Sequence, residues 1–180
     1  MAEIKSTLDL VLERTRNLVM TEREKIENAR VEFRRSLAGL LQRHQDRALT
    51  LKQFRQELVQ LQEQTGISDV RAVIEEIAAR MDPDSRSEPL FEILAEVCGV
   101  DGKGFESILD DYTDAVEGAR QSRIERVRDR LLKVNGISGA AVRPCLEGDK
   151  EWEAELRNIR DHFIGLLNEE TKRVLDSLPA

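Results

Sequence analysis

The sequence predicts an all-α fold, an elongated helical bundle of about seven helices with coiled-coil-like packing. Apolar residues recur three and four positions apart along nearly the whole chain, which is the period of one helix face. These apolar stripes are long and narrow, as in coiled coils, and charged residues make up 35% of the composition. No segment shows the strict alternation of a half-buried strand.

A length of 180 residues is sufficient for one hydrophobic core without a disulfide or a structural metal. We therefore expect a single all-helical domain over residues 1–180. Within it the elements group into N-terminal helices at 1–66, short buried helices at 67–100 and a C-terminal helical hairpin at 101–180.

A first helix is predicted at about 3–19, because its apolar positions are four, three, four and three residues apart. Thr21 then stands three residues before Glu24. This is the spacing of a capping box, in which each side chain accepts a hydrogen bond from the other residue's backbone N–H. We expect a second helix to begin there and to continue for about 28 residues.

A second capping box, Thr50–Gln53, opens a third helix at about 51–64. Gly66 is expected to end it, because glycine adopts the left-handed conformation without steric cost. We expect Ser68 to cap a fourth helix. Pro83 is expected to end that helix, since proline lacks a backbone donor and has a fixed φ.

The fifth helix, at about 88–98, is apolar on most of its surface, so we expect it to be the most buried element. A sixth helix at about 105–134 and a seventh, capped by Asp149, are expected to match in length. A connection of about 14 residues allows this pair to form a long antiparallel hairpin.

The connection between the last two helices, NGISGAAVRPCLEGDKEW from Asn135 to Trp152, is more apolar than a solvated turn requires. Two interpretations are open. Ile137, Val142 and Leu146 either fold back over the helix ends as a lid on the core, or stay exposed as a docking patch for a protein partner. We expect the lid, because burying two or three such side chains contributes on the order of several kcal/mol.

Carboxylates follow one face of the sixth helix at Glu106, Asp110 and Asp114. Such a stripe is usually a solvated face, and the alternative is a surface for a basic partner. A di-metal site would add Glu-x-x-His motifs on facing helices, which this sequence lacks. We therefore expect no metal here, and the three carboxylates join the three apolar loop residues as candidates for partner binding.

The net charge is −7, and the acidic excess lies in residues 65–118, with 4 Lys and Arg against 14 Asp and Glu. Nucleic-acid binding requires a basic face, so we expect no nucleic-acid partner. No apolar run approaches the roughly 20 residues of a membrane-spanning helix, so we expect no membrane partner. Glu3, Lys5 and Asp9 interrupt the apolar core that a secretory signal needs, which indicates a cytoplasmic protein.

The sequence offers few candidates for chemistry. His44 and His162 lie within or beside apolar stripes, with no Cys, Asp or second His at ligand spacing. Cys98 and Cys145 are isolated thiols, and the motifs of phosphate loops and of nucleophilic serines are missing. We therefore expect no catalytic residue, metal or cofactor, and a protein that is not an enzyme.

Two segments carry a family resemblance. MAEIKSTLDLVLERTRNL at residues 1–18, and GISGAAVRPCL at residues 136–146 ahead of a helix led by Trp152, resemble a small group of short all-helical bacterial proteins of unknown function. The resemblance implies a bacterial cytoplasmic protein. It implies no activity, cofactor, partner or site.

The expected function is that of a non-enzymatic helical interaction, scaffold or assembly protein with an unknown protein partner, acting as a homodimer. One alternative is a regulatory factor that binds a larger complex through its acidic middle segment. Another is an enzyme or small-ligand binder with a pocket between helices. A large apolar surface would favour the first class, and a concave pocket with convergent polar groups would favour the last.

Overall fold

The computed structural model describes residues 21–85, 88–139 and 141–179. In these ranges the chain forms six helices and no strand. The helices are α2 (Glu22–Gln45), α3 (Leu51–Thr65), α4 (Val70–Ala78), α5 (Glu88–Glu96), α6 (Lys103–Asn135) and α7 (Lys150–Ser177). None of the described helices is long and apolar enough to cross a membrane. The helix predicted at 3–19 lies outside the described residues.

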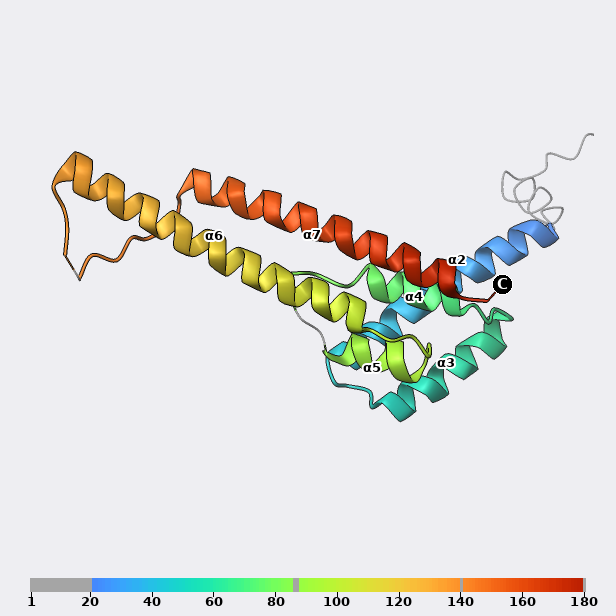
Figure 1. Ribbon diagram of the computed structural model, residues 1–180. Coiled ribbons are helices and arrows are strands. Elements are labelled where there is room, and N and C mark those ends of the chain that lie inside the picture. Colours follow the sequence, from blue (N-terminus) through green and yellow to red (C-terminus); the bar gives the residue numbers. More distant parts are fainter. Residues whose placement is uncertain (1–20, 86–87, 140, 180) are drawn as a thin grey trace, which may run out of the picture.

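The helices form a body and a projecting arm (Figure 1). Helices α2 to α5 gather at one end of the molecule, where α4 packs against α2, α5 and α7. Helices α6 and α7 pack side by side in opposite directions, and their far halves extend well beyond the body. We call this far part, with the loop at residues 136–149, the arm. The predicted long C-terminal helical pair is thus confirmed.

The hydrophobic core lies in the body. Its fully buried side chains include Phe33 of α2, Phe54 of α3 and Phe105 at the start of α6. Helix α5 adds Ile93 and Leu94, both fully buried, as its apolar surface predicted. A body built on aromatic and branched aliphatic side chains supports the arm without needing the arm for its own core.

Three helix starts follow the predicted capping residues. Thr21, Thr50 and Asp149 each accept a hydrogen bond from a backbone N–H in the first turn of the following helix. In the first two cases the capping box is complete. These starts are predictable because each cap and its partner lie within three residues of one another.

Helix α4 differs from the prediction at both ends. Asp69 is its N-cap in place of Ser68, because the helix begins immediately after Asp69 and the carboxylate accepts from two backbone N–H groups at 3.0 and 3.3 Å. The helix ends at Ala78, before Pro83. The chain turns there, and Arg80 donates to a backbone carbonyl oxygen of α2 at 2.9 Å.

Helices α6 and α7 hold 33 and 28 residues, so the predicted equal lengths are wrong. Near the body, Gly104 of α6 faces Glu170 of α7 so closely that a Cβ on Gly104 would lie 2.0 Å from a carboxylate oxygen. In the arm, Arg123 and Arg126 form ion pairs with the first turns of α7. Beyond the ion pair of Arg126 with Glu155, the end of α6 extends past the start of α7 (Figure 1). We call residues 127–137 the overhang.

Candidate interaction surface

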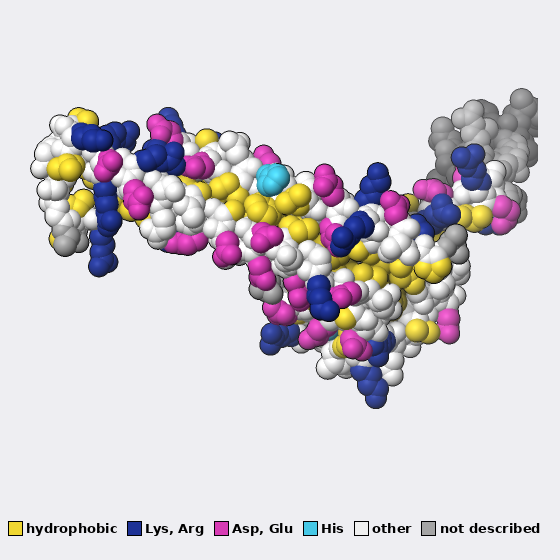
Figure 2. Space-filling view, in the orientation of Figure 1, with side chains coloured by type: hydrophobic (Ala, Val, Ile, Leu, Met, Phe, Trp, Pro, Cys, Tyr) yellow, Lys and Arg dark blue, Asp and Glu magenta, His cyan; other side chains and the backbone are white. Residues whose placement is uncertain are grey.

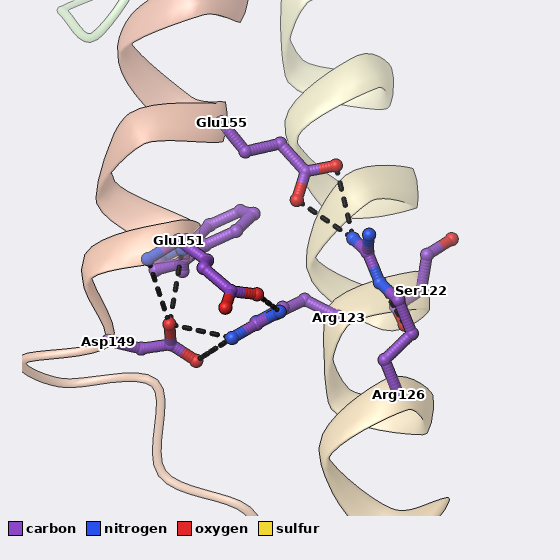
Figure 3. A network of polar contacts seen from close by, with 7 residues as sticks. Ser122, Arg123, Arg126, Asp149, Glu151 and Glu155 are labelled. Atoms are coloured by element: carbon purple, nitrogen blue, oxygen red, sulfur yellow. Dashed lines mark hydrogen bonds and ion pairs between the residues drawn. The ribbon is translucent and has the colours of Figure 1, made fainter. Parts of the chain in front are cut away.

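A buried arginine joins α6 to the start of α7 (Figure 3). Arg123 is only 5% exposed, although it lies in the projecting arm. Its Nη2 donates to both carboxylate oxygens of Asp149 at 2.8 Å, and its Nε donates to one of them at 2.9 Å. Its Nη1 donates to the carboxylate of Glu151. Arg123 therefore binds two carboxylates at the N-terminus of α7.

Asp149 has a second role in the same cluster. Its Oδ1 accepts hydrogen bonds from the backbone N–H groups of Glu151 at 3.1 Å and Trp152 at 3.3 Å, which caps α7. The Arg123 guanidinium, and after it these backbone donors, hold the pKa of Asp149 below its ordinary value. The same ion pair raises the pKa of Arg123. The residue that starts α7 is thus fixed to the side of α6, and this sets the stagger of the two helices.

The overhang has no α7 opposite it and is the most exposed apolar part of the described chain. It contains three of the seven large hydrophobic side chains described as exposed, namely Leu132 at 51%, Val134 at 74% and Ile137 at 48%. The other four are divided among α2, α3 and α4. Gly136, with φ of +67°, ends α6 in the left-handed conformation and turns the chain back.

Basic side chains surround these hydrophobic ones. Arg128, Arg130 and Lys133 are exposed, and Figure 2 shows Lys and Arg side chains gathered at the end of the arm. Lys133 lies 3.8 Å from the carboxylate of Asp129, and Arg128 donates to the carbonyl oxygen of Val142 at 3.5 Å. The overhang therefore combines exposed apolar surface with positive charge.

The loop residues predicted as a lid on the core do not lie on it. Ile137 is half-exposed, Val142 and Leu146 are half-buried, and none of them belongs to the core. The lid prediction is wrong because the loop joins the helices at the far end of the arm. About 35–40 Å of α6 separates Leu109, a core residue, from Val134 at the helix end.

The second predicted set lies at the other end of α6. Asp110 and Asp114 are exposed and Glu106 is half-buried. All three are in the part of α6 nearest the body, whereas the apolar loop residues are in the arm (Figure 1). The structure therefore does not bring the two predicted sets together within one chain.

An ion-pair cluster that the sequence did not indicate joins the connector before α5 to the hairpin. Tyr112 of α6 donates to the carboxylate of Asp84, and Arg160 of α7 contacts Asp84 at 2.8 Å and Asp82 at 3.2 Å. Burial, and then the hydrogen bond to Asp84, raise the pKa of Tyr112 to about 12. The cluster attaches the base of the arm to the body. Its members are too far apart in sequence for any spacing rule to have found it.

Two of the residues considered as candidates for chemistry, His44 and Cys98, are buried or partly buried. His44 is 4% exposed, with its Nδ1 3.0 Å from the carbonyl oxygen of Leu49 and its Nε2 3.7 Å from the carboxylate of Glu92. Cys98 and Cys145 are free thiols, and partial burial raises the pKa of Cys98 to about 11. That pKa leaves Cys98 protonated and poorly nucleophilic near neutral pH.

Open pockets lie on the described surface of the body. One of about 370 Å³ lies between α3, α4 and the end of α5, one of about 530 Å³ between α2 and α3, and one of about 380 Å³ beside Arg160. Within residues 21–85, 88–139 and 141–179, no group of three or more His, Cys, Asp or Glu residues is placed to hold a metal ion.

No family model, curated protein or solved structure matches this chain. The described residues form an all-α protein with a compact body and a long helical arm. The resemblance of residues 1–18 and 136–146 to a bacterial protein group remains an expectation.

Proposed function

We propose that this chain is a helical scaffold protein that binds a protein partner through the overhang of its arm. The observation that carries the proposal is the placement of Leu132, Val134 and Ile137. Three large exposed hydrophobic side chains fall within six residues at the end of the arm, with Leu132 and Val134 on different sides of α6, so the apolar surface extends around the end of the helix. Clustered exposed apolar residues are typical of interaction sites, whereas scattered ones need no explanation.

The energetics favour a partner at this position. Full burial of a Val, Leu or Ile side chain contributes roughly 1.5–3 kcal/mol, so covering three half-exposed ones contributes roughly 3 kcal/mol. The ion pairs of Arg123 and Arg126 hold the two arm helices together before any partner arrives. A preorganised surface loses less conformational entropy on binding, and this improves affinity without new contacts.

The proposed scaffold works in the cytoplasm, without a cofactor, metal or chemistry of its own. A non-enzymatic role is supported by the buried and half-buried charged side chains, because these form ion pairs that hold the helices together. Arg123 binds the start of α7, and Arg160 binds Asp82 and Asp84 before α5. The narrow apolar stripes of the arm suit coiled-coil-like packing against another helical surface.

A photo-crosslinking amino acid placed in the overhang tests the proposal. Leu132 is 51% exposed, and Val59 of α3 in the body is also 51% exposed, which makes it a matched control. After illumination in cells, the label at Leu132 should give a discrete covalent adduct with a protein, and the label at Val59 should not. Equal labelling from both positions, or no adduct from Leu132, would contradict the proposal.

A second variant separates binding from folding. Leu132→Gln with Ile137→Gln removes apolar surface that is about half solvated already. Glutamine has nearly the helix propensity of leucine, so α6 should persist. We expect the adduct or complex to be lost while the melting temperature changes little. A large fall in melting temperature would show that these residues serve the fold.

A further inference from the structure

Helix α6 has opposite charges in its two halves. Residues 103–117 hold five carboxylates and one lysine, and residues 118–135 hold six Arg and Lys residues against two carboxylates. The net charges are −4 and +4. An inverted copy of α6 therefore places a positive half opposite a negative half.

Two exposed charges on α6 lie along one line of the helix. Asp110 and Arg128 are both exposed, and the 18 residues between their positions correspond to five full turns. They point in the same direction about 27 Å apart. Asp114 is one turn from Asp110 and adds to the negative end. Each end of this line can therefore meet the opposite end of the same line in another molecule.

Twofold symmetry turns this complementarity into an interface. When two α6 helices lie antiparallel with the axis near Ala119, Asp110 of each copy lies opposite Arg128 of the other, and the pair forms twice. A parallel arrangement would instead place like charges together. The charge pattern therefore selects the antiparallel arrangement from the two ways in which two arms can lie side by side.

Apolar surface along the arm adds to the charge pairing. Ile124 and Leu131 of α6, four residues before and three residues after Arg128, lie on the same side of the helix and are only half-buried. Figure 2 shows hydrophobic side chains along the arm between the charged ones. Two α6 helices that pack antiparallel along this line can cover this apolar surface on both copies. The overhang of one copy then lies beside the acidic first turns of α6 in the other.

We propose that the partner of the arm is a second copy of this chain, bound antiparallel through α6 so that the basic overhang of each copy covers the acidic start of α6 in the other. This inference rests on the proposed function, since it names a partner for the same overhang. It also joins the two predicted sets of residues, because Asp110 and Asp114 of one copy face the overhang side of the other.

Charge exchange between two variants tests the arrangement. Asp110→Arg makes both ends of the line positive, and Arg128→Asp makes both ends negative, so each variant alone should repel its own copies. Two symmetry-related pairs change from attraction to repulsion, and we expect each variant to dimerise at least about tenfold more weakly than wild type. An equimolar mixture of the two should restore the dimer, because every facing pair is then of opposite sign.

Sedimentation equilibrium measures these affinities at about 0.05 and about 0.5 M salt, and the wild-type dimer should weaken at the higher salt as the charges are screened. Lys172→Asp, an exposed change on α7 with the same alteration of net charge as Arg128→Asp, is the control and should leave dimerisation unchanged. Circular dichroism confirms that each variant is folded.

The possible outcomes separate the two proposals. A wild-type monomer at all concentrations overturns the dimer, and so does a mixture that associates no better than its components. If the chain is monomeric and the label at Leu132 still captures a different protein, the dimer is wrong and the proposed scaffold function stands. If the dimer forms as described but Leu132 gives no adduct, the use of the overhang is wrong.

Discussion

The same substitution at two glycines in the body should change stability in opposite directions. Gly39 lies within α2 and Gly66 ends α3 with φ of +68°, and at both positions an added Cβ meets nothing within 4 Å. Contacts therefore contribute nothing, and only backbone conformation decides the result. Gly39→Ala should stabilise by about 0.5–1 kcal/mol, because alanine loses less entropy in a helix. Gly66→Ala should destabilise by about 1–2 kcal/mol, because alanine is strained in the left-handed region.

For a chain of this length, about 1 kcal/mol corresponds to a shift of about 2–4 °C in melting temperature. Thermal unfolding followed by circular dichroism should show Gly39→Ala melting about 1–4 °C above wild type and Gly66→Ala about 2–8 °C below it. The protein concentration is kept equal, so that association affects all samples alike. A Gly66→Ala variant as stable as wild type, or a destabilised Gly39→Ala variant, would refute the reasoning.

Three further predictions concern the arm and the thiols. The pKa of Asp149 is lower in the folded state than its ordinary value of 3.8, so its ionised form stabilises the fold at neutral pH. The difference in melting temperature between wild type and Asp149→Asn should be present at pH 7, begin to shrink as the pH falls below 3.8, and be lost once the pH falls through the lower, folded-state pKa. Val142→Asp with Leu146→Asp should lower the melting temperature only slightly, and a loss of many degrees would show that the fold depends on the packing of this loop against the arm. Alkylation at mildly alkaline pH, followed by mass spectrometry, should label the exposed Cys145 well before Cys98. Partial burial raises the pKa of Cys98 to about 11, so little of its thiol is ionised at that pH. Equal labelling rates at the two cysteines would contradict the burial of Cys98.

Local signals in the sequence predicted the helices well. Thr21, Thr50 and Asp149 begin the helices that they were expected to begin, and Gly66 ends α3, because each signal acts through bonds within a few residues. The fourth helix shows the limit of this approach. Ser68 and Asp69 are adjacent and both are good caps, so residue type alone did not decide between them.

Contacts between residues far apart in the sequence were harder to predict. Asp149 was predicted as a cap, but its partner Arg123 lies 26 residues away on another helix, and no spacing rule joins the two. The stagger depends on this pair, so the predicted equal lengths hid the overhang. Val134 follows Leu131 at the three-residue spacing of an apolar helix face, yet it is 74% exposed because α7 does not reach it.

Because of the two roles of Asp149, the relative position of α6 and α7 does not depend on the length of the loop between them. Because one carboxylate both starts α7 and binds Arg123, the helix pair is aligned by contacts that lie outside residues 136–148. Doubling such a loop costs only about 0.6 kcal/mol in closure entropy. The segment can therefore lengthen, or accept an inserted peptide, while the helices keep their alignment. The loop sequence can therefore vary, as it does in the hypervariable loops of binding proteins, while the two arm helices keep the same relative position.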